Sequence, residues 1–343
     1  MDIDMNRQQP RYIPQMESIS EAINKQTTII QCIQLHNESE FVNSVLSSIY
    51  NEVDKIFVIE GAVKNRPNAT EDGHSIDNTV ELINDFIKNN DTLKKITFIQ
   101  IKRPWHNLEE MKQTFLDMAR PGDWILINDA DEFYMPDDIK RLRLAIDRNP
   151  HICEFIPTFL HFYGDIFTVA KPGPEWQPFH QRFFKYTRGM KYINHPTVTD
   201  AEGYDTYFSP HYWNRRYLMN DFFIYHYGYA RRNMDKIMTD KQEYYEKELA
   251  AHGAANKKFD QKVKDWINNS EPVLIYDGSH PQAFLSEDVF DVPTKRKGNV
   301  IGDWEHDPFY SKIINNEPCG SMWLNQTGQA LPRIPFFHNQ VNI

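Results

Sequence analysis

The stretch GDWILINDADEF, residues 122–133, decides how the rest of this sequence is interpreted. Its apolar run WILIN (124–128) predicts a strand that leads directly into Asp129 and, two residues later, Asp131. Alternate side chains of a strand point to the same side, so both carboxylates can reach one ligand at the edge of the sheet. Two carboxylates suit Mn²⁺ or Mg²⁺, with diphosphate oxygens and water completing the coordination shell.

A simpler interpretation of the acids after this strand is a turn that starts a helix. That interpretation explains Asp137 and Asp138, which follow a proline as residues at a helix N-terminus often do. It does not explain Asp129, Asp131 and Glu132, because three acids at the end of an apolar strand repel one another unless a cation lies between them. The sequence therefore predicts a divalent metal site.

Strands and helices alternate on the N-terminal side of this stretch. Short apolar, β-branched runs predict strands, and amphipathic patterns predict the helices between them. The predicted strands cover residues 27–35, 55–60 and 95–101, and the predicted helices cover residues 38–50, 75–90 and 108–119. The alternation predicts an α/β fold with a mostly parallel central sheet and helices on both faces. Ligands of such sheets bind at the carboxyl ends of the strands.

Composition and charge exclude several other classes of protein. The chain of 343 residues carries a net charge of −10, and its basic pairs are scattered, so general nucleic-acid binding is not expected. Three cysteines without metal-ligand spacing argue against a disulfide framework and fit a reducing compartment. We find neither a signal peptide nor an apolar run of 18 residues, so we expect a cytoplasmic protein without a membrane span.

An Asp-x-Asp pair after the fourth strand of such an alternation resembles the donor domain of GT-A glycosyltransferases, which have a Rossmann-like sheet. The segment DWILINDADEF is similar to that of family-2-like members, and the resemblance covers roughly residues 28–245. It implies a metal-dependent transfer of a sugar from a nucleotide-sugar donor, with a UDP-sugar favoured. The acceptor hydroxyl is not identified, and it would belong to a glycan, a protein or a modified nucleobase.

The resemblance also implies roles for individual residues. The Asn-Glu pair after the first strand, the acid that ends the second strand, and the Ser-x-Asp-x-Thr segment at 75–79 are donor-side elements of such enzymes. About a dozen residues are inserted after Glu60 and Gly61, so Asp72 or Asp77 is an alternative to Glu60 at the nucleoside. The expected donor-binding residues are His36, Asn37, Glu38, Glu60, Asp77, Arg103, Lys112, Asp129, Arg231, Lys241 and His280.

The strand DFFIYHYGYA (221–230) contains His226, and many GT-A enzymes supply a third metal ligand from a late histidine. The resemblance thus implies a metal site of Asp129, Asp131 and His226. A neutral imidazole is a competent Mn²⁺ ligand, although a lone histidine in an apolar strand is more often a core residue. An inverting enzyme also needs a general base, for which we favour Asp165 over His180 and His195, while a turn residue is the simpler interpretation of Asp165.

The sequence predicts four parts: an N-terminal arm (1–26), a nucleotide-sugar-binding subdomain (27–150), an acceptor-side and metal-completing part (151–269), and a C-terminal extension rich in loops (270–343). Two other functions stay open. A nucleotidyltransferase has a related fold, but it requires a glycine-rich loop after the first strand, where this chain has LHNESE. A non-catalytic module that binds a glycan or a nucleotide would have the same fold.

Overall fold

The fold was taken from a computed structural model. It describes residues 27–173, 176–193, 198–206, 209, 212, 215–240, 242–243, 257–285 and 298–314. Within these ranges the predicted α/β fold is confirmed. Two predicted site residues, Lys241 and His195, lie outside the described residues.

Four parallel strands form the centre of the sheet. They are β1 (Ile29–Leu35), β2 (Lys55–Glu60), β3 (Ile96–Ile99) and β4 (Trp124–Asp129), in the spatial order β4-β1-β2-β3. The connecting helices are α2 (Val42–Ser48), α3 (Thr79–Asn89) and α4 (Leu108–Met118). Because the strands run in the same direction, their carboxyl ends lie at one edge, with Gln34 beside Asp129 and Leu35 beside Glu60.

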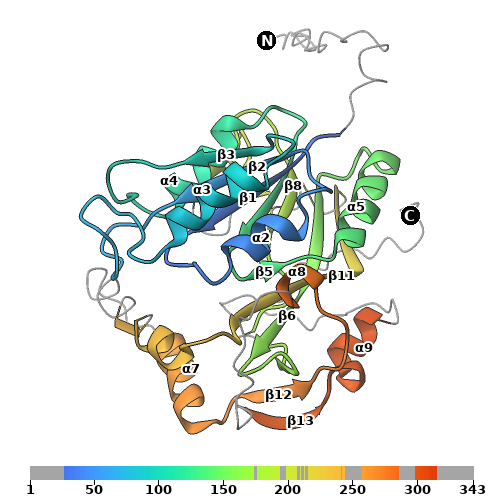
Figure 1. Ribbon diagram of the computed structural model, residues 1–343. Coiled ribbons are helices and arrows are strands. Elements are labelled where there is room, and N and C mark those ends of the chain that lie inside the picture. Colours follow the sequence, from blue (N-terminus) through green and yellow to red (C-terminus); the bar gives the residue numbers. More distant parts are fainter. Residues whose placement is uncertain are drawn as a thin grey trace, which may run out of the picture.

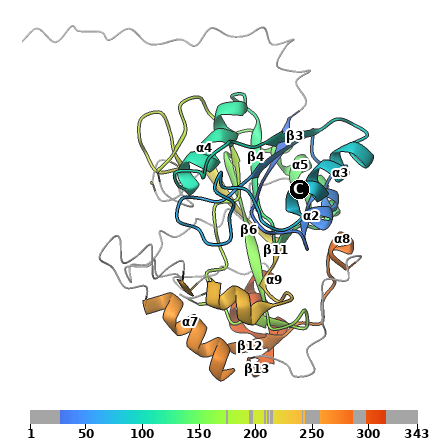
Figure 2. The ribbon, with the colours of Figure 1, turned by 60° about the vertical axis from the view of Figure 1, so that its left-hand side comes forward.

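The apolar side chains of β1 alternate between two cores, one on each face of the sheet. Ile29 and Ile33 pack with α2, α3 and the following helix α5 (Pro136–Arg148), whereas Ile30 and Cys32 pack with α4. Figure 2 shows α4 on one side of these strands and α2, α3 and α5 on the other. Strands buried on both faces carry continuous apolar runs, which is why the sequence pattern identified them.

The sheet continues with strands of mixed direction, which the predicted parallel pattern did not include. Strand β8 (Phe183–Lys185) lies between β4 and β6 (Glu154–Tyr163) and is antiparallel to both. Next to β6 lie β7 (Thr168–Ala170) and the long β11 (Arg216–Tyr229), and β11 also pairs with the short β5 (Glu132–Phe133). A small separate sheet pairs β9 (Lys191–Tyr192) with β10 (Val198–Thr199).

The C-terminal residues contribute strands to the same sheet. Strand β12 (Pro272–Ile275) pairs with β7, and β13 (Asn299–Asp303) forms the edge next to β12. The accompanying helices are α7 (Lys257–Asn268), α8 (Gln282–Leu285), η2 (Trp304–His306) and α9 (Pro308–Ile314). Figure 1 shows β6 and β11 running from the β1–β4 region to this lower part of the molecule. The described part of residues 270–343 is thus joined to the sheet, although we had expected mainly loops.

Residues 234–240 form a helix directly after β11. Its Met234 and Met238 are buried beside Trp176 and Trp266, so its remaining face is free to line the pocket described below. None of the described helices is long and apolar enough to cross a membrane.

Candidate functional site

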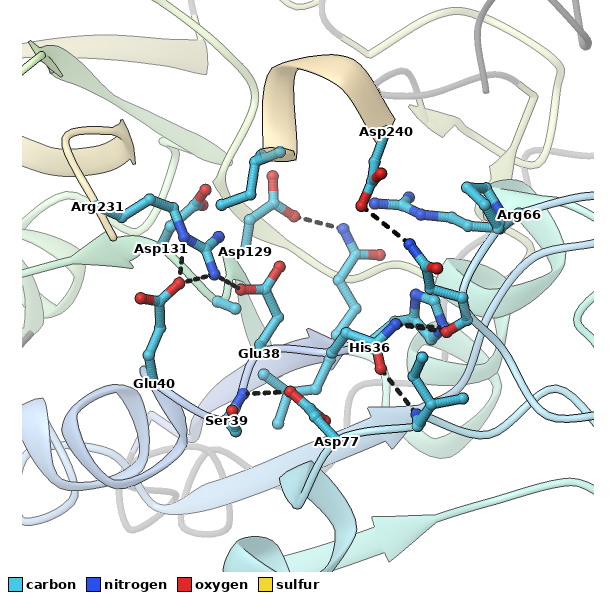
Figure 3. Close-up of a pocket in the computed structure, with 18 of the residues that line it drawn as sticks. His36, Glu38, Ser39, Glu40, Arg66, Asp77, Asp129, Asp131, Arg231 and Asp240 are labelled. Carbon is cyan, nitrogen blue, oxygen red and sulfur yellow. Dashed lines mark hydrogen bonds and ion pairs between the residues drawn. The ribbon is translucent and has the colours of Figure 1, made fainter. Parts of the chain in front are cut away.

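A pocket of about 740 Å³ lies at the carboxyl ends of β1, β2 and β4. Parallel sheets place ligands there because loops diverge from that edge. Figure 3 shows Asp129, Asp131, Glu38 and Arg231 toward one end of the pocket and Arg66 toward the other. Of the residues predicted from sequence, the pocket is lined by His36, Asn37, Glu38, Asp77, Asp129, Asp131, His226 and Arg231.

The acids after β4 are partly neutralised by Arg182, a residue that sequence analysis did not identify. Arg182 is 5% exposed, and its Nη2 lies 2.7 Å from Glu132 Oε1 and 2.9 Å from Asp129 Oδ2. The other oxygen of Asp129 accepts a hydrogen bond from the Gln34 side chain. Mutual repulsion of the acids is therefore relieved in part by a protein cation, and both oxygens of Asp129 have partners within the chain.

Asp131 and His226 do meet in the pocket, although 95 residues separate them in the sequence. His226 Nε2 lies 3.7 Å from Asp131 Oδ1, and both side chains are mostly buried. The backbone N–H of Tyr227 donates to the Asp131 carbonyl at 2.8 Å, which ties β11 to the loop after β4. Behind His226, its Nδ1 lies 2.8 Å from Nδ1 of His161 on the neighbouring strand β6.

Gly228 keeps the space beside this pair open. A Cβ atom at this position would lie 2.5 Å from Asp131 Oδ2 and 2.7 Å from His226 Nε2, so only glycine fits without a shift of one of them. The pairing of β11 with β6 shifts register between His226 and Tyr229, as it does at a β-bulge. The bulge thus lets two functional groups approach the backbone closely.

Arg231 binds acids on the other side of the same end of the pocket. Its guanidinium forms ion pairs with Glu38, at 2.8 Å, and with Glu40, and it lies 4.5 Å above the Phe41 ring. Burial raises the pKa of Glu38, and the charge of Arg231 opposes that shift. Arg231 thus lines the pocket with two carboxylates already bound, and its role as a donor contact stays a prediction.

Lys112 is the third cation near the acids. It is 1% exposed and does not line the pocket. Burial lowers its pKa to about 8, and the charge of Asp129 limits the shift. Lys112 therefore interacts electrostatically with the acid cluster, and nothing in the pocket lining supports the predicted contact with a donor.

His36 and Asn37 lie where β1 ends. Asn37 has a positive φ of 55°, a conformation that asparagine tolerates better than most residues. Its Oδ1 accepts from the Ile76 N–H at 2.8 Å, and its own N–H donates to Ser75 Oγ at 2.9 Å. Burial lowers the pKa of His36 to about 4, with a smaller contribution from the charge of Arg66. His36 is therefore a neutral donor or acceptor in the pocket wall at pH 7.

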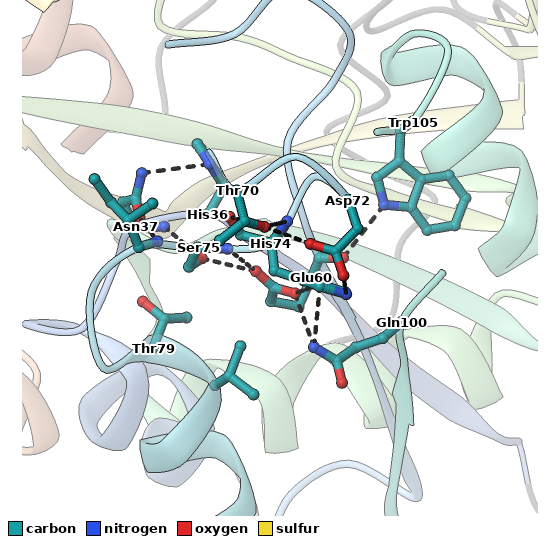
Figure 4. Close-up of polar contacts among 12 residues, drawn as sticks. His36, Asn37, Glu60, Thr70, Asp72, His74, Ser75, Thr79, Gln100 and Trp105 are labelled. Carbon is teal, nitrogen blue, oxygen red and sulfur yellow. Dashed lines mark hydrogen bonds and ion pairs between the residues drawn. The ribbon is translucent and has the colours of Figure 1, made fainter. Parts of the chain in front are cut away.

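Glu60 lies at the base of the inserted loop rather than in the pocket lining. Glu60 is fully buried. One carboxylate oxygen accepts hydrogen bonds from the Ser75 N–H and hydroxyl, each at 2.7 Å. The other accepts from the Gln100 side chain at 2.9 Å and lies 2.8 Å from His74 Nδ1 (Figure 4). These contacts occupy both carboxylate oxygens, so the structure gives Glu60 the role of closing the loop. Asp77, one of the two alternatives, lines the pocket, whereas Asp72 hydrogen-bonds Thr70.

The inserted loop, residues 61–75, is closed at its base by backbone hydrogen bonds. The Ala62 N–H donates to the Gly73 carbonyl at 2.7 Å, and the Trp105 N–H donates to the Ala62 carbonyl at 2.9 Å. Gly73 has a φ of +89°, and a Cβ there would lie 2.6 Å from Pro104 Cα, so the closure requires glycine.

The tip of this loop forms one wall of the pocket, through Arg66, Pro67 and Asn68. The Asn68 side chain donates to Asp240 on the opposite wall at 2.9 Å, which Figure 3 marks between the two elements. The inserted loop made the nucleoside contacts hard to assign from sequence. In the structure, its tip forms part of the pocket wall.

Three other predicted residues do not line the pocket. Arg103 is exposed and pairs with Glu110 at 2.5 Å. His280 lies 2.8 Å from the Tyr227 hydroxyl in an aromatic cluster. Asp165 accepts from the Phe167 N–H at 2.8 Å and the Thr168 hydroxyl at 2.9 Å. Asp165 thus shapes the turn between β6 and β7, in agreement with the simpler interpretation of that residue.

Comparison with known proteins identifies the family. Among solved structures, residues 1–349 of S. aureus TarS are similar over 71% of both chains, with 12% identity and a TM-score of 0.37. A protein from Bacillus anthracis, described as a glucose-1-phosphate thymidylyltransferase, is similar over 47% of this chain and 69% of its own, with 11% identity and a TM-score of 0.26. These low scores carry no functional argument, and no curated protein matches in a sequence search. The family described as glycosyl transferase family 2 matches residues 32–208, more than half of the sequence, and the chain therefore belongs to this family of glycosyltransferases.

Proposed function

We propose that this enzyme transfers a sugar from a nucleotide-sugar donor, with a UDP-sugar favoured, to an acceptor hydroxyl, and that it requires Mn²⁺ or Mg²⁺. The observation that carries the proposal is the approach of the Asp131 carboxylate to His226 Nε2 in the pocket, with Gly228 keeping the adjacent space clear. A divalent cation there would neutralise, as a Lewis acid, the charge that develops on the leaving diphosphate.

The chemistry of the residues fits such a cation. Carboxylate oxygen and neutral imidazole nitrogen are both ligands of Mn²⁺. No group of three or more potential protein ligands is assembled within the described ranges. Two protein ligands leave positions for diphosphate oxygens and water, which is how Mg²⁺ and Mn²⁺ are often held beside phosphorylated substrates.

The charge at this end of the pocket supports the same proposal. Five carboxylates interact with one another here: Glu38, Glu40, Asp129, Asp131 and Glu132. The protein cations that interact with them are Arg182, Arg231, Arg232 and Lys112. With all groups ionised, five negative charges against four positive ones leave a net charge of −1. A divalent cation would outweigh this negative charge and let an anionic donor enter.

Arg232 is our candidate for binding the diphosphate. It lines the pocket, and its Nε is buried without a hydrogen-bond partner among the described residues. A buried donor that lacks a partner costs free energy, and a phosphate oxygen would satisfy it. Its neighbour Arg231 already binds Glu38 and Glu40, so the two arginines would have different tasks.

The nucleoside would then lie at the other end of the pocket, near His36 and Asn37. Val63, Leu108 and Met111 add apolar surface to the pocket lining, and a base can pack against such surface. The tip of the inserted loop closes this end. Within the proposal these residues bind and orient the donor and exclude water from it.

A thermal-shift panel with UDP-, GDP-, CMP- and dTDP-sugars, each with and without Mn²⁺, tests the proposal. A ligand at 100 times its Kd stabilises the native state by about 2.7 kcal/mol, so the correct donor should raise Tm only when Mn²⁺ is present. Asp131→Asn should abolish the shift, while Asp137→Asn, at an exposed acid paired with Lys140, should preserve it. Donor binding and full turnover in excess EDTA would contradict the proposal.

A further inference from the structure

Two histidines on neighbouring strands lie behind the pocket. His226 on β11 is paired in register with His161 on β6, and adjacent residues in register point to the same face of a sheet. Their rings are perpendicular, with centroids 5.0 Å apart, and the two Nδ1 atoms are 2.8 Å apart. This is hydrogen-bond distance, so one of the two nitrogens carries a hydrogen and the other does not.

The direction of this hydrogen bond follows from the third group in the chain. His161 Nε2 lies 2.9 Å from the backbone carbonyl oxygen of Gln177. A carbonyl only accepts, so His161 must donate from Nε2. His161 is 7% exposed and lies beside the rings of Phe159 and Trp176, surroundings that favour an uncharged imidazole. A neutral His161 with its hydrogen on Nε2 has only a lone pair on Nδ1.

His226 must therefore donate from Nδ1 to His161. A neutral His226 with its hydrogen on Nδ1 has a lone pair at Nε2, and Nε2 is the atom that lies 3.7 Å from Asp131 Oδ1. A lone pair that faces a carboxylate is unfavourable unless a cation lies between them. The three hydrogen-bonding groups thus prepare His226 to bind a cation rather than to donate to Asp131.

We infer that His161 is a positioning residue, which holds His226 in the tautomer whose Nε2 can bind the metal ion. The inference rests on the proposed metal site. His161 does not touch the donor or the cation, and its effect passes through the orientation and tautomer of one ligand. Such outer-shell partners typically contribute roughly 10- to 100-fold to metal affinity.

Nitrogen NMR of the metal-free, ¹⁵N-histidine-labelled full chain tests the tautomer directly. His226 Nδ1 should show the shift of a protonated nitrogen and Nε2 that of an unprotonated one, with assignment by loss of signals in His226→Ala. In His161→Phe, which keeps a ring but has no acceptor, the His226 hydrogen should redistribute toward Nε2. Protonation of both His226 nitrogens, or of Nε2 alone, in the wild-type chain at pH 7 would overturn the inference.

Mn²⁺ titration followed by electron paramagnetic resonance separates this inference from the proposed function. His161→Phe should weaken Mn²⁺ binding by at least about 10-fold, and His161→Gln, whose side-chain oxygen can accept from Nδ1, should restore part of it. His306→Phe, the same change at an exposed histidine that is not among the pocket-lining residues, is the matched control and should leave the affinity unchanged.

The outcomes of that titration are distinct. If His226→Ala weakens Mn²⁺ binding while His161→Phe does not, His161 has only a packing role and the inference fails alone. If the wild-type chain binds no Mn²⁺, or if His226→Ala leaves its affinity unchanged, the proposed metal site fails as well.

Discussion

Replacing Gly228 by alanine adds a single methyl group at the point where Asp131 and His226 meet. The new Cβ would lie 2.5 Å from the carboxylate oxygen and 2.7 Å from the imidazole nitrogen, against 3.4 Å for ordinary contact. With the backbone in place, Asp131 must therefore move by about 0.9 Å and His226 by about 0.7 Å. Metal–ligand distances tolerate only about 0.2 Å, so the predicted displacement is several times larger than a site can absorb.

We expect Gly228→Ala to lower the affinity for Mn²⁺ at least about 100-fold, the upper end of what an outer-shell change causes, because both ligands are displaced at once. Turnover at limiting Mn²⁺ should fall in parallel. The assay is a calorimetric Mn²⁺ titration together with release of nucleoside diphosphate from the donor that the thermal-shift panel identifies.

Gly302→Ala is the matched control, since it adds the same methyl to another strand glycine, where the nearest atom is 3.9 Å from the new Cβ. Circular dichroism and the unfolding midpoint show whether either variant is misfolded. A Gly228→Ala chain that folds and binds Mn²⁺ with wild-type affinity would refute the placement of a cation between Asp131 and His226.

Three further predictions concern the Asp131–His226 pair, Arg182 and the buried Glu154. Asp131→Asn and His226→Ala should each weaken Mn²⁺-dependent donor binding, and the double variant should be little worse than either, because both act on one site; full additivity in a binding titration contradicts this. Arg182→Met leaves two acids without their cation and should lower the free energy of unfolding by about 3–5 kcal/mol, measured in urea, whereas an unchanged midpoint would deny the role of Arg182. Burial raises the pKa of Glu154 from 4.5 to about 8. The folded state therefore holds the proton more tightly than the unfolded state, so the free energy of unfolding is highest below pH 4.5 and falls as the pH rises toward 8. Glu154→Gln should lose less stability than wild type between pH 5 and pH 9, and parallel pH profiles would count against the shift.

The parallel half of the fold was readable from sequence because its strands are local apolar runs. WILIN and KIFVIE are buried on both faces, so each strand appears as a short uninterrupted run, and β2 begins and ends where the pattern predicted. The antiparallel strand β8 was harder to place. Nothing local in residues 183–185 reveals that they enter the sheet between β4 and β6.

The pocket was predicted best where residues directly follow a strand. Asp131 and the residues after β1 lie at the sheet edge because chain geometry puts them there. Arg182 and His161 were missed because their roles depend on contacts across 53 and 65 residues of sequence. Each looks like an ordinary strand residue in its own segment.

Asp165 shows that a structural role in a turn can produce the sequence pattern expected of a catalytic acid. An acid after a glycine near a strand end is common in turns, because its carboxylate accepts from backbone N–H groups two residues on. Its hydrogen bond from the Phe167 N–H has that pattern. Sequence alone did not separate a turn acid from a catalytic one, and the contacts of the side chain were needed to show its place.

The base and the tip of the inserted loop differ in how much change in sequence they can tolerate. Its base depends on backbone hydrogen bonds and on Gly73, which packs against Pro104, so mutations there would lower the stability of the folded state. Its tip, residues 65–69, has asparagines at two left-handed positions and otherwise contributes side chains to the pocket wall. If the proposed donor site is correct, exchanging the tip would change donor preference while the sheet and the acid cluster stay as they are. Libraries that vary Arg66 and Pro67 and keep the two left-handed asparagines would explore specificity at little risk to folding.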